Sequence, residues 1–353
     1  MDNKEKIEKL ETLLFSNQVT RTIPDAESKK VNGKPYMYYG VDNKFPQYLW
    51  NLYNKSAILQ SIINGTSDYV MGNEIKFGDS ISDLVEMANS DYDKLEDVIK
   101  KNSIDYLIFG GFAIQILRTR TGNIGEIFWL DMNRCRVNED RTKLYYSEDW
   151  SKWSPDFVEY DIYDPKTGKG DVIYFRGHKT RSTYPVPIYV GALTSVEIST
   201  EISKFHLNAI LNNFNVSAII NFNNGKPEDS IREEMEKNFN NKFCGSENAS
   251  KFLLSFNNDK DHATEVTRLQ GDDFDKKYEA LTSNTMKDIF ISFRATPALF
   301  GVNPENNGFS KQEFTESFEL YNKTVVSPIQ KDIARVYNNI LGENAITFVP
   351  FSL

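Results

Sequence analysis

Cysteine and histidine are both scarce in this chain. Cys135 and Cys244 are the only cysteines among 353 residues, and they lie more than 100 positions apart. They exclude a disulfide framework and a cysteine-rich zinc site, and they suit a reducing cytoplasm. His178, His206 and His262 share no spacing that is typical of metal ligands. The sequence therefore predicts no metal and no cofactor.

Long apolar runs are also lacking. No run of about 18 apolar residues occurs, so no segment is expected to span a membrane. The opening residues MDNKEKIEKLETLL are polar and charged, unlike a signal peptide. Phosphate-binding loops, nucleophile elbows and HExxH motifs are absent, and Gly110-Gly111 lacks the spacing of a dinucleotide fingerprint. These absences argue against an enzyme.

Positive charge is in deficit, since the formal net charge is −9. Proteins that grip nucleic acid by its phosphates need an excess of Lys and Arg, so a simple DNA-gripping module is excluded. What the chain does have is apolar and aromatic side chains, at 40% and 13% of its residues. At this length they predict a real core and two or more substructures.

The first 190 residues predict an α+β unit with a mostly antiparallel sheet. Apolar residues recur at helical spacing over 1–15, over 45–70 with a break near Asn54, and over 84–109. Alternating patterns then predict strands over 113–118, 125–130, 143–146, 158–163 and 171–175.

Beyond Pro187 the pattern changes to long helices around a small insertion. Thr194 with Glu197 is a helix-start signature, and the helix is expected to reach about Asn215. A β-α-β insertion follows, with strands over 217–222 and 251–256, a charged helix over 228–243, and a possible third strand over 263–269. A second helix is expected from Asp272 to the residue before Pro297.

The last third combines a loop with a very long helix. Two prolines, two glycines and three asparagines over 297–310 predict a loop without regular structure. Ser310 and Glu313 cap the following helix, which Pro328 is expected to kink. Gly342 ends this helix, and a short strand-like tail follows.

Four local runs together with this order of elements resemble the tailed-bacteriophage portal protein family. The runs are YGVDNKFP at 39–46, FGGFA at 109–113, TYPVPIY at 183–189 and RATPALFG at 294–301. The resemblance implies a portal-type α+β fold. Many family members carry a helical crown after the long helix, and here the crown is expected to be short or absent unless the chain is truncated. The implied parts are a wing (1–191), a stem of two helices (192–216 and 271–296), a clip (217–270), a tunnel loop (297–310), a long kinked wing helix (311–341) and a tail (342–353).

The resemblance implies a structural role in the virion. Portal proteins form a ring, usually of about twelve subunits, at one capsid vertex, where double-stranded DNA enters and leaves without sequence specificity. The expected partners are further copies of the chain, the terminase large subunit, the major capsid and scaffolding proteins and a head–tail adaptor, with no membrane. Assembly is expected in the host cytoplasm.

The resemblance also selects candidate site residues. The tunnel-loop candidates are Asn303, Pro304, Glu305, Asn306 and Asn307. The stem candidates are Lys276, Lys277, Lys287 and Arg294, with Lys204 on the first helix. The partner-docking candidates of the clip are Lys226, Glu228, Arg232, Glu233, Glu236 and Lys237.

Other interpretations stay open at this point. The stem cations also fit a solvated helix face that pairs with Asp273 or Glu279, and the clip charges fit an ordinary solvated helix. A neck adaptor is a second structural hypothesis. A metal-dependent DNA-processing enzyme is a third, with dispersed carboxylates as candidate ligands: Asp131, Asp272, Asp273 and Glu313.

Overall fold

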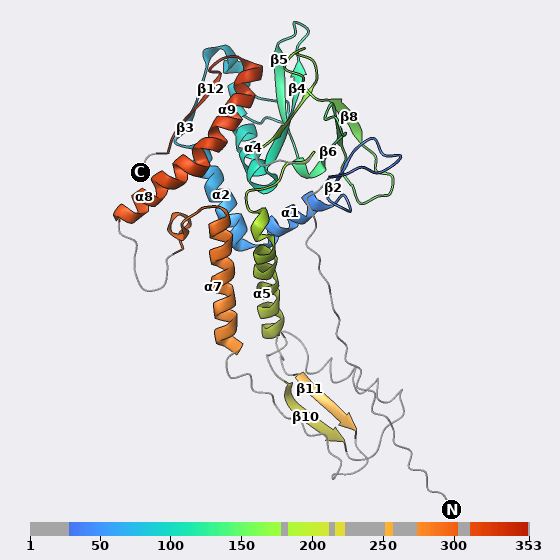
Figure 1. Cartoon of the computed structure of the whole chain (residues 1–353), viewed down its shortest axis with the longest axis vertical. Helices are drawn as coiled ribbons and strands as arrows, with labels where there is room; N and C mark the ends of the chain where they lie inside the picture. The colour runs from blue at the N-terminus through green and yellow to red at the C-terminus, as the bar shows by residue number, and fades with distance from the viewer. Residues whose placement is uncertain are drawn as a thin grey trace, which may run out of the picture.

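The computed structural model describes residues 28–177, 183–211, 216–222, 251–256, 274–302 and 311–351. Figure 1 shows a body of helices and strands from which two helices, α5 (Leu193–Leu211) and α7 (Phe274–Ser292), descend side by side. Strands β10 (Val216–Phe222) and β11 (Lys251–Phe256) lie beyond their far ends. The predicted mixture of helix and strand is confirmed.

Helix α2 is at the centre of the body. It packs against helices from both ends of the chain. The body helices are α1 (Phe45–Lys55), α2 (Ala57–Met71), α3 (Ser82–Glu86), α4 (Leu95–Phe109), α8 (Lys311–Tyr321) and α9 (Ser327–Leu341). Thr66 of α2 shares a hydrogen bond of 2.6 Å with the hydroxyl of Tyr321, and both side chains are buried. Gln330 of α9 donates its amide N–H to the carbonyl of Val70 at 2.9 Å.

Two predicted helical regions are each divided in the structure. The break expected near Asn54 lies at Ser56, whose hydroxyl accepts the N–H of Leu59 and caps α2. The single region predicted over 84–109 is wrong, because α3 ends at Glu86 and α4 begins at Leu95. Between them the side chain of Asn89 accepts the N–H groups of Asp91 and Asp93, which holds a turn in place of helix.

The body holds two antiparallel three-stranded sheets, where a single sheet was expected. The first has the order β5-β4-β9 and packs against α4, and the second has the order β6-β7-β8. The strands are β4 (Gly111–Arg118), β5 (Ile124–Leu130), β6 (Cys135–Val137), β7 (Lys143–Tyr146), β8 (Val158–Asp161) and β9 (Val172–Arg176). Strand β6 was not predicted, since its three residues are too short for a pattern.

A smaller sheet joins distant parts of the chain. Strand β12 (Ile346–Val349) pairs antiparallel with β3 (Glu74–Phe77), which confirms the strand expected in the tail. Gly72, just before β3, has φ +71°. A Cβ there would lie 2.2 Å from the carbonyl oxygen of Val349, so only glycine lets the last strand approach this closely.

The long helix expected over 310–341 is interrupted by a π-helical turn, η6 (Asn322–Val326), between α8 and α9. The two helices point in different directions in Figure 1. Pro328 is the second residue of α9, so the irregular turn lies just before the predicted kink. Proline has no N–H to donate to the carbonyl four residues earlier, that of Thr324, which weakens the helix here.

Candidate functional site

Helices α5 and α7 form an antiparallel pair that descends from the body. They pack against each other through buried Val196 and Thr200 on α5 and Thr285 and Ile289 on α7. Both helices were predicted from apolar spacing. Helix α5 begins one residue earlier than Thr194, because it continues a 3₁₀ turn over Val190–Ala192. His206 lies exposed on α5, whereas His178 and His262 lie outside the described residues.

The upper end of the pair is fixed to the body by two stacked aromatic rings. Tyr189, before α5, and Phe293, after α7, are fully buried, with ring centroids 5.2 Å apart and planes 17° apart. The hydroxyl of Tyr189 donates to the carbonyl of Ile108 at the end of α4, at 3.0 Å. Burial raises the pKa of this hydroxyl above its ordinary value, so it remains a donor. The direction of the helix pair is therefore set by contacts inside the body.

The outward faces of the pair carry apolar side chains. Leu207 is 56% exposed, Leu281 is 41% exposed and Ile291 is 72% exposed. These three side chains give the helix pair apolar surface that the body does not cover.

The predicted stem cations differ in their surroundings. Lys287 and Arg294 are exposed, and neither has an ion pair among the described residues. Lys204 instead pairs with Glu201, a neighbour on its own helix, at 2.7 Å. Lys276 and Lys277 lie on the first turns of α7, where the structure describes only the backbone.

A tight turn follows α7 and differs from the irregular loop that was expected. Arg294 has φ +55°, an uncommon conformation for a residue with a side chain. Residues Pro297–Phe300 then form a 3₁₀ turn, η5, so the expectation of no regular structure is wrong for these four residues. Proline suits the first position of such a turn because its φ is already set. Tyr69 donates its hydroxyl to the carbonyl of Leu299 at 2.7 Å and ties the turn to α2.

A cleft of about 340 Å³ lies beside this turn. Leu107, Val186, Ile188 and Val325 contribute most of its apolar lining, and Arg294 adds a guanidinium. Such a lining can hold an apolar side chain.

Two groups of predicted residues lie outside the described residues. One is the tunnel-loop set Asn303, Pro304, Glu305, Asn306 and Asn307. The other is the clip set Lys226, Glu228, Arg232, Glu233, Glu236 and Lys237, together with the helix predicted over 228–243 and the third strand over 263–269. The two strands that flank this helix, β10 and β11, pair in parallel, as a β-α-β connection requires.

Two of the four carboxylates that were weighed as metal ligands lie among the described residues. Asp131 caps a 3₁₀ turn by accepting the N–H of Asn133 at 2.9 Å, and Glu313 lies exposed on α8. Asp272 and Asp273 lie outside the described residues. Within the described part of the chain, no three His, Cys, Asp or Glu side chains form a group that could hold a metal ion. None of its helices is long and apolar enough to cross a membrane.

A sequence comparison identifies the family. A family model described as phage portal protein matches residues 64–353. The chain belongs to the phage portal protein family. This finding confirms the resemblance seen in the sequence, and the portal family is structural, not enzymatic. No curated protein sequence matches the chain.

Solved structures of particle necks share the fold of this chain. The neck of an empty gene transfer agent particle, solved with sixfold symmetry, matches with a TM-score of 0.55 and 12% identity over 87% of this chain and 85% of that one. The neck of the native particle, solved with twelvefold symmetry, matches with a TM-score of 0.54 and 14% sequence identity. The match covers 86% of this chain and 84% of that one. A portal protein of the HK97 family from Corynebacterium diphtheriae matches with a TM-score of 0.49 and 12% sequence identity. The match covers 85% of this chain and 94% of that one.

The body of this portal-family chain contains a buried arginine that the sequence did not reveal. Arg136 on β6 is fully buried, and burial lowers the pKa of its guanidinium. All five of its N–H donors are used, with acceptors on Asn43, Gln47, Asn133 and Cys135 at 2.6–3.2 Å.

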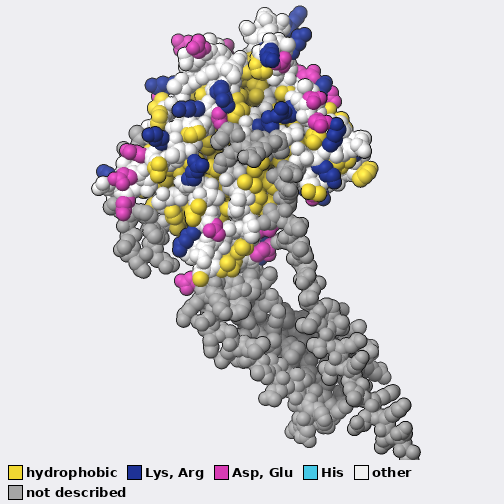
Figure 2. All heavy atoms as spheres, in the orientation of Figure 1, with side chains coloured by type: hydrophobic (Ala, Val, Ile, Leu, Met, Phe, Trp, Pro, Cys, Tyr) yellow, Lys and Arg dark blue, Asp and Glu magenta, His cyan; other side chains and the backbone are white. Residues whose placement is uncertain are grey.

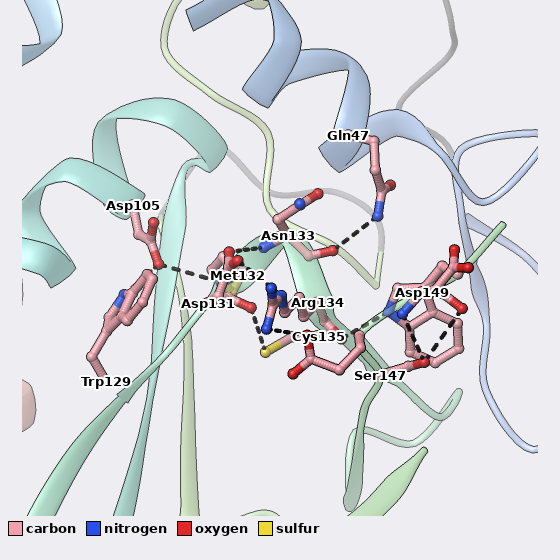
Figure 3. A network of polar contacts seen from close by, with 12 residues as sticks. Gln47, Asp105, Trp129, Asp131, Met132, Asn133, Arg134, Cys135, Ser147 and Asp149 are labelled. Atoms are coloured by element: carbon pink, nitrogen blue, oxygen red, sulfur yellow. Dashed lines mark hydrogen bonds and ion pairs between the residues drawn. The ribbon is translucent and has the colours of Figure 1, made fainter. Parts of the chain in front are cut away.

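Asp105 belongs to a second polar network, close to that of Arg136. Figure 3 shows Asp105 together with Gln47 and Asn133. Its buried carboxylate accepts the indole N–H of Trp129 at 2.8 Å and the backbone N–H of Met132 at 3.3 Å. Burial, with a further contribution from the charge of Asp131, raises the pKa of Asp105 well above its ordinary value. The first network ties β6 to Asn43 and Gln47, and the second ties α4 to β5 and to the turn that follows it.

Proposed function

We propose that this chain forms the portal ring of a virion, with the α5/α7 pairs of successive copies standing side by side around a channel for double-stranded DNA. The observation that carries the proposal is the exposed apolar surface on a helix pair that the body holds firmly at one end. Neighbouring copies would cover Leu207, Leu281 and Ile291. The twelvefold symmetry of a structurally similar neck supports a ring of about that size.

The parts of the fold are assigned on this basis. The body is the wing, α5 and α7 are the stem, the segment that carries β10 and β11 is the clip, and residues 297–310 are the tunnel loop. Helices α8 and α9 form the kinked wing helix. In this arrangement DNA is conducted and not gripped, because the net charge of the chain is −9.

The partners follow from the same assignment. The energy for packaging comes from a separate motor, whose terminase large subunit docks on the clip during packaging. A head–tail adaptor docks there later. The wing contacts the major capsid and scaffolding proteins as the capsid vertex is built in the host cytoplasm.

Electron microscopy of the purified protein tests the ring directly. Negatively stained particles should show rings with a central hole, and native mass spectrometry should give the number of copies. A protein that remains monomeric at high concentration, in the presence of scaffolding protein, would contradict the proposal.

A deletion tests the role of the tunnel loop separately. Removing residues 302–308 should leave the ring intact and reduce DNA packaging or retention, because the loop is proposed to contact the moving phosphate backbone. A matched control removes 120–122, an exposed turn of the β4–β5 hairpin, and should package normally. Packaging at the wild-type level after the first deletion would refute this role.

A further inference from the structure

The outer face of α7 joins an apolar side chain to two cations. Ile291 is 72% exposed, Lys287 lies one helical turn before it and Arg294 lies three residues after it. Because residues four apart share a helix face, Lys287 and Ile291 lie on one face of α7. Arg294 lies beyond the end of the helix, exposed in the turn that follows it, where its φ is +55°. Neither cation has an ion pair among the described residues.

The outer face of α8 has the opposite character. Leu320 is 65% exposed, with Glu316 one turn before it and Glu319 next to it, both exposed. The other side of α8 is buried against the body, where Phe318 packs on Tyr69 with ring centroids 5.5 Å apart. The acidic stripe of α8 therefore points outward, and Figure 2 shows acidic side chains at the left edge of the molecule, where α8 lies.

We propose that the outer face of α8 of one copy docks on the outer face of α7 of the next copy. Leu320 packs against Ile291 of the neighbour, and Glu316 and Glu319 approach its Lys287 and Arg294. The complementary charges set the orientation, and the two apolar side chains leave water together.

The proposed contact joins two different patches of the same protein. Such a head-to-tail interface repeats around an axis and closes into a ring, whereas a contact between identical patches stops at a dimer. The inference rests on the proposed ring and adds to it the surfaces that meet.

Disulfide cross-linking tests the contact directly. In a Cys244→Ser background, Ile291→Cys and Leu320→Cys are made as separate chains, assembled together and oxidised mildly. The mixture should give a cross-linked dimer on a non-reducing gel, and neither chain alone should. A chain with both changes should give a ladder of oligomers. Leu281→Cys combined with Leu320→Cys is the matched control and should give little cross-linking, because Leu281 lies ten residues before Ile291, about 15 Å away along α7.

Charge reversal gives a second, independent test. Arg294→Glu should lower the fraction of protein in rings at least tenfold at low salt, and Glu319→Arg in the same chain should restore most of it. Lys331→Glu, an exposed cation on α9, is the control and should assemble normally.

The outcomes separate the two proposals. Wild-type rings without cross-linking, or rings that tolerate Arg294→Glu, would overturn the docking of α8 on α7 and leave the ring proposal standing. Failure of the wild-type protein to form rings would overturn both.

Discussion

The body and the α5/α7 pair bury their side chains in different ways. In the body, α2 is surrounded by helices from both halves of the chain, and even the guanidinium of Arg136 is fully enclosed. The helix pair is packed on its inner side and at its upper end, and it leaves Ile291 largely exposed. The difference teaches that the body encloses its side chains through its own contacts, whereas the pair leaves apolar surface that the proposed ring would cover.

The largest expected effect lies in the body. Arg136→Ala removes all five donors of the guanidinium and leaves buried carbonyl oxygens without partners. We expect the free energy of unfolding to fall by about 4 kcal/mol, measured by urea denaturation with tryptophan fluorescence. Arg335→Ala, at an exposed ion pair with Asp332, is the control and should change it by less than about 1 kcal/mol. Equal effects of the two changes would mean that the enclosure of Arg136 contributes little.

The junction between the two regions comes next. Phe293→Ala deletes one of the two stacked rings that hold α7 on the body and leaves a cavity. A loss of about 3 kcal/mol is expected in the same denaturation experiment. Tyr189→Phe keeps the stack and removes the hydrogen bond to Ile108, so a loss of about 1 kcal/mol is expected. If both variants matched the wild type, the pair would be fixed by other contacts.

A smaller effect should appear as a dependence on pH. The pKa of Asp105 is raised in the folded state, so the folded protein holds this proton more tightly than the unfolded chain. The stability from this group is complete below about pH 4 and is lost as the pH rises through the folded pKa. Asp105→Asn keeps an acceptor for Trp129 and removes the titration. Between pH 4 and pH 8 the free energy of unfolding of the wild type should therefore fall more than that of the variant, as measured by denaturation at each pH. If the two free energies changed with pH in parallel, Asp105 would not be the cause of the pH dependence.

The smallest effect on the monomer is expected on the helix pair. Leu281→Ser changes a side chain that is 41% exposed, so the free energy of unfolding should stay within about 0.5 kcal/mol of the wild type. Sedimentation should nevertheless show weaker assembly, because the proposed interface loses apolar area. A large loss of monomer stability would mean that Leu281 belongs to the core of a single copy. Unchanged assembly would mean that Leu281 is not part of the interface.

The helices were largely predictable from the sequence, because apolar spacing alone locates them to within a few residues. The spacing of the apolar residues also indicates the π turn, although no such turn was predicted. Tyr321, Val325, Ile329 and Ile333 follow one another in three steps of four residues. At about 100° per residue, such a run advances about 120° beyond three full turns, so a regular α-helix would rotate it off the core. The wider turn at Asn322–Val326 absorbs the excess and keeps all four side chains facing inward.

The candidate site was less predictable. Exposure of Ile291 depends on what the neighbouring elements leave uncovered, and helical spacing alone does not contain that information. The burial of Arg136 depends on carbonyl groups of Asn133 and Cys135 that only the folded turn presents. The roles of the tunnel-loop asparagines and of the clip charges stay predictions.

The pairing of β12 with β3 has a consequence for the order of events during synthesis. Ile346 is the partner of Phe77, so β3 cannot pair until a segment much later in the sequence has left the ribosome. Contacts between such distant parts of a chain form slowly, because a long loop must close first. Until then β3 keeps an open edge, and other copies of the nascent protein can bind to it. Late closure of this strand pair therefore leaves the growing polypeptide open to aggregation until residues 346–349 have been made.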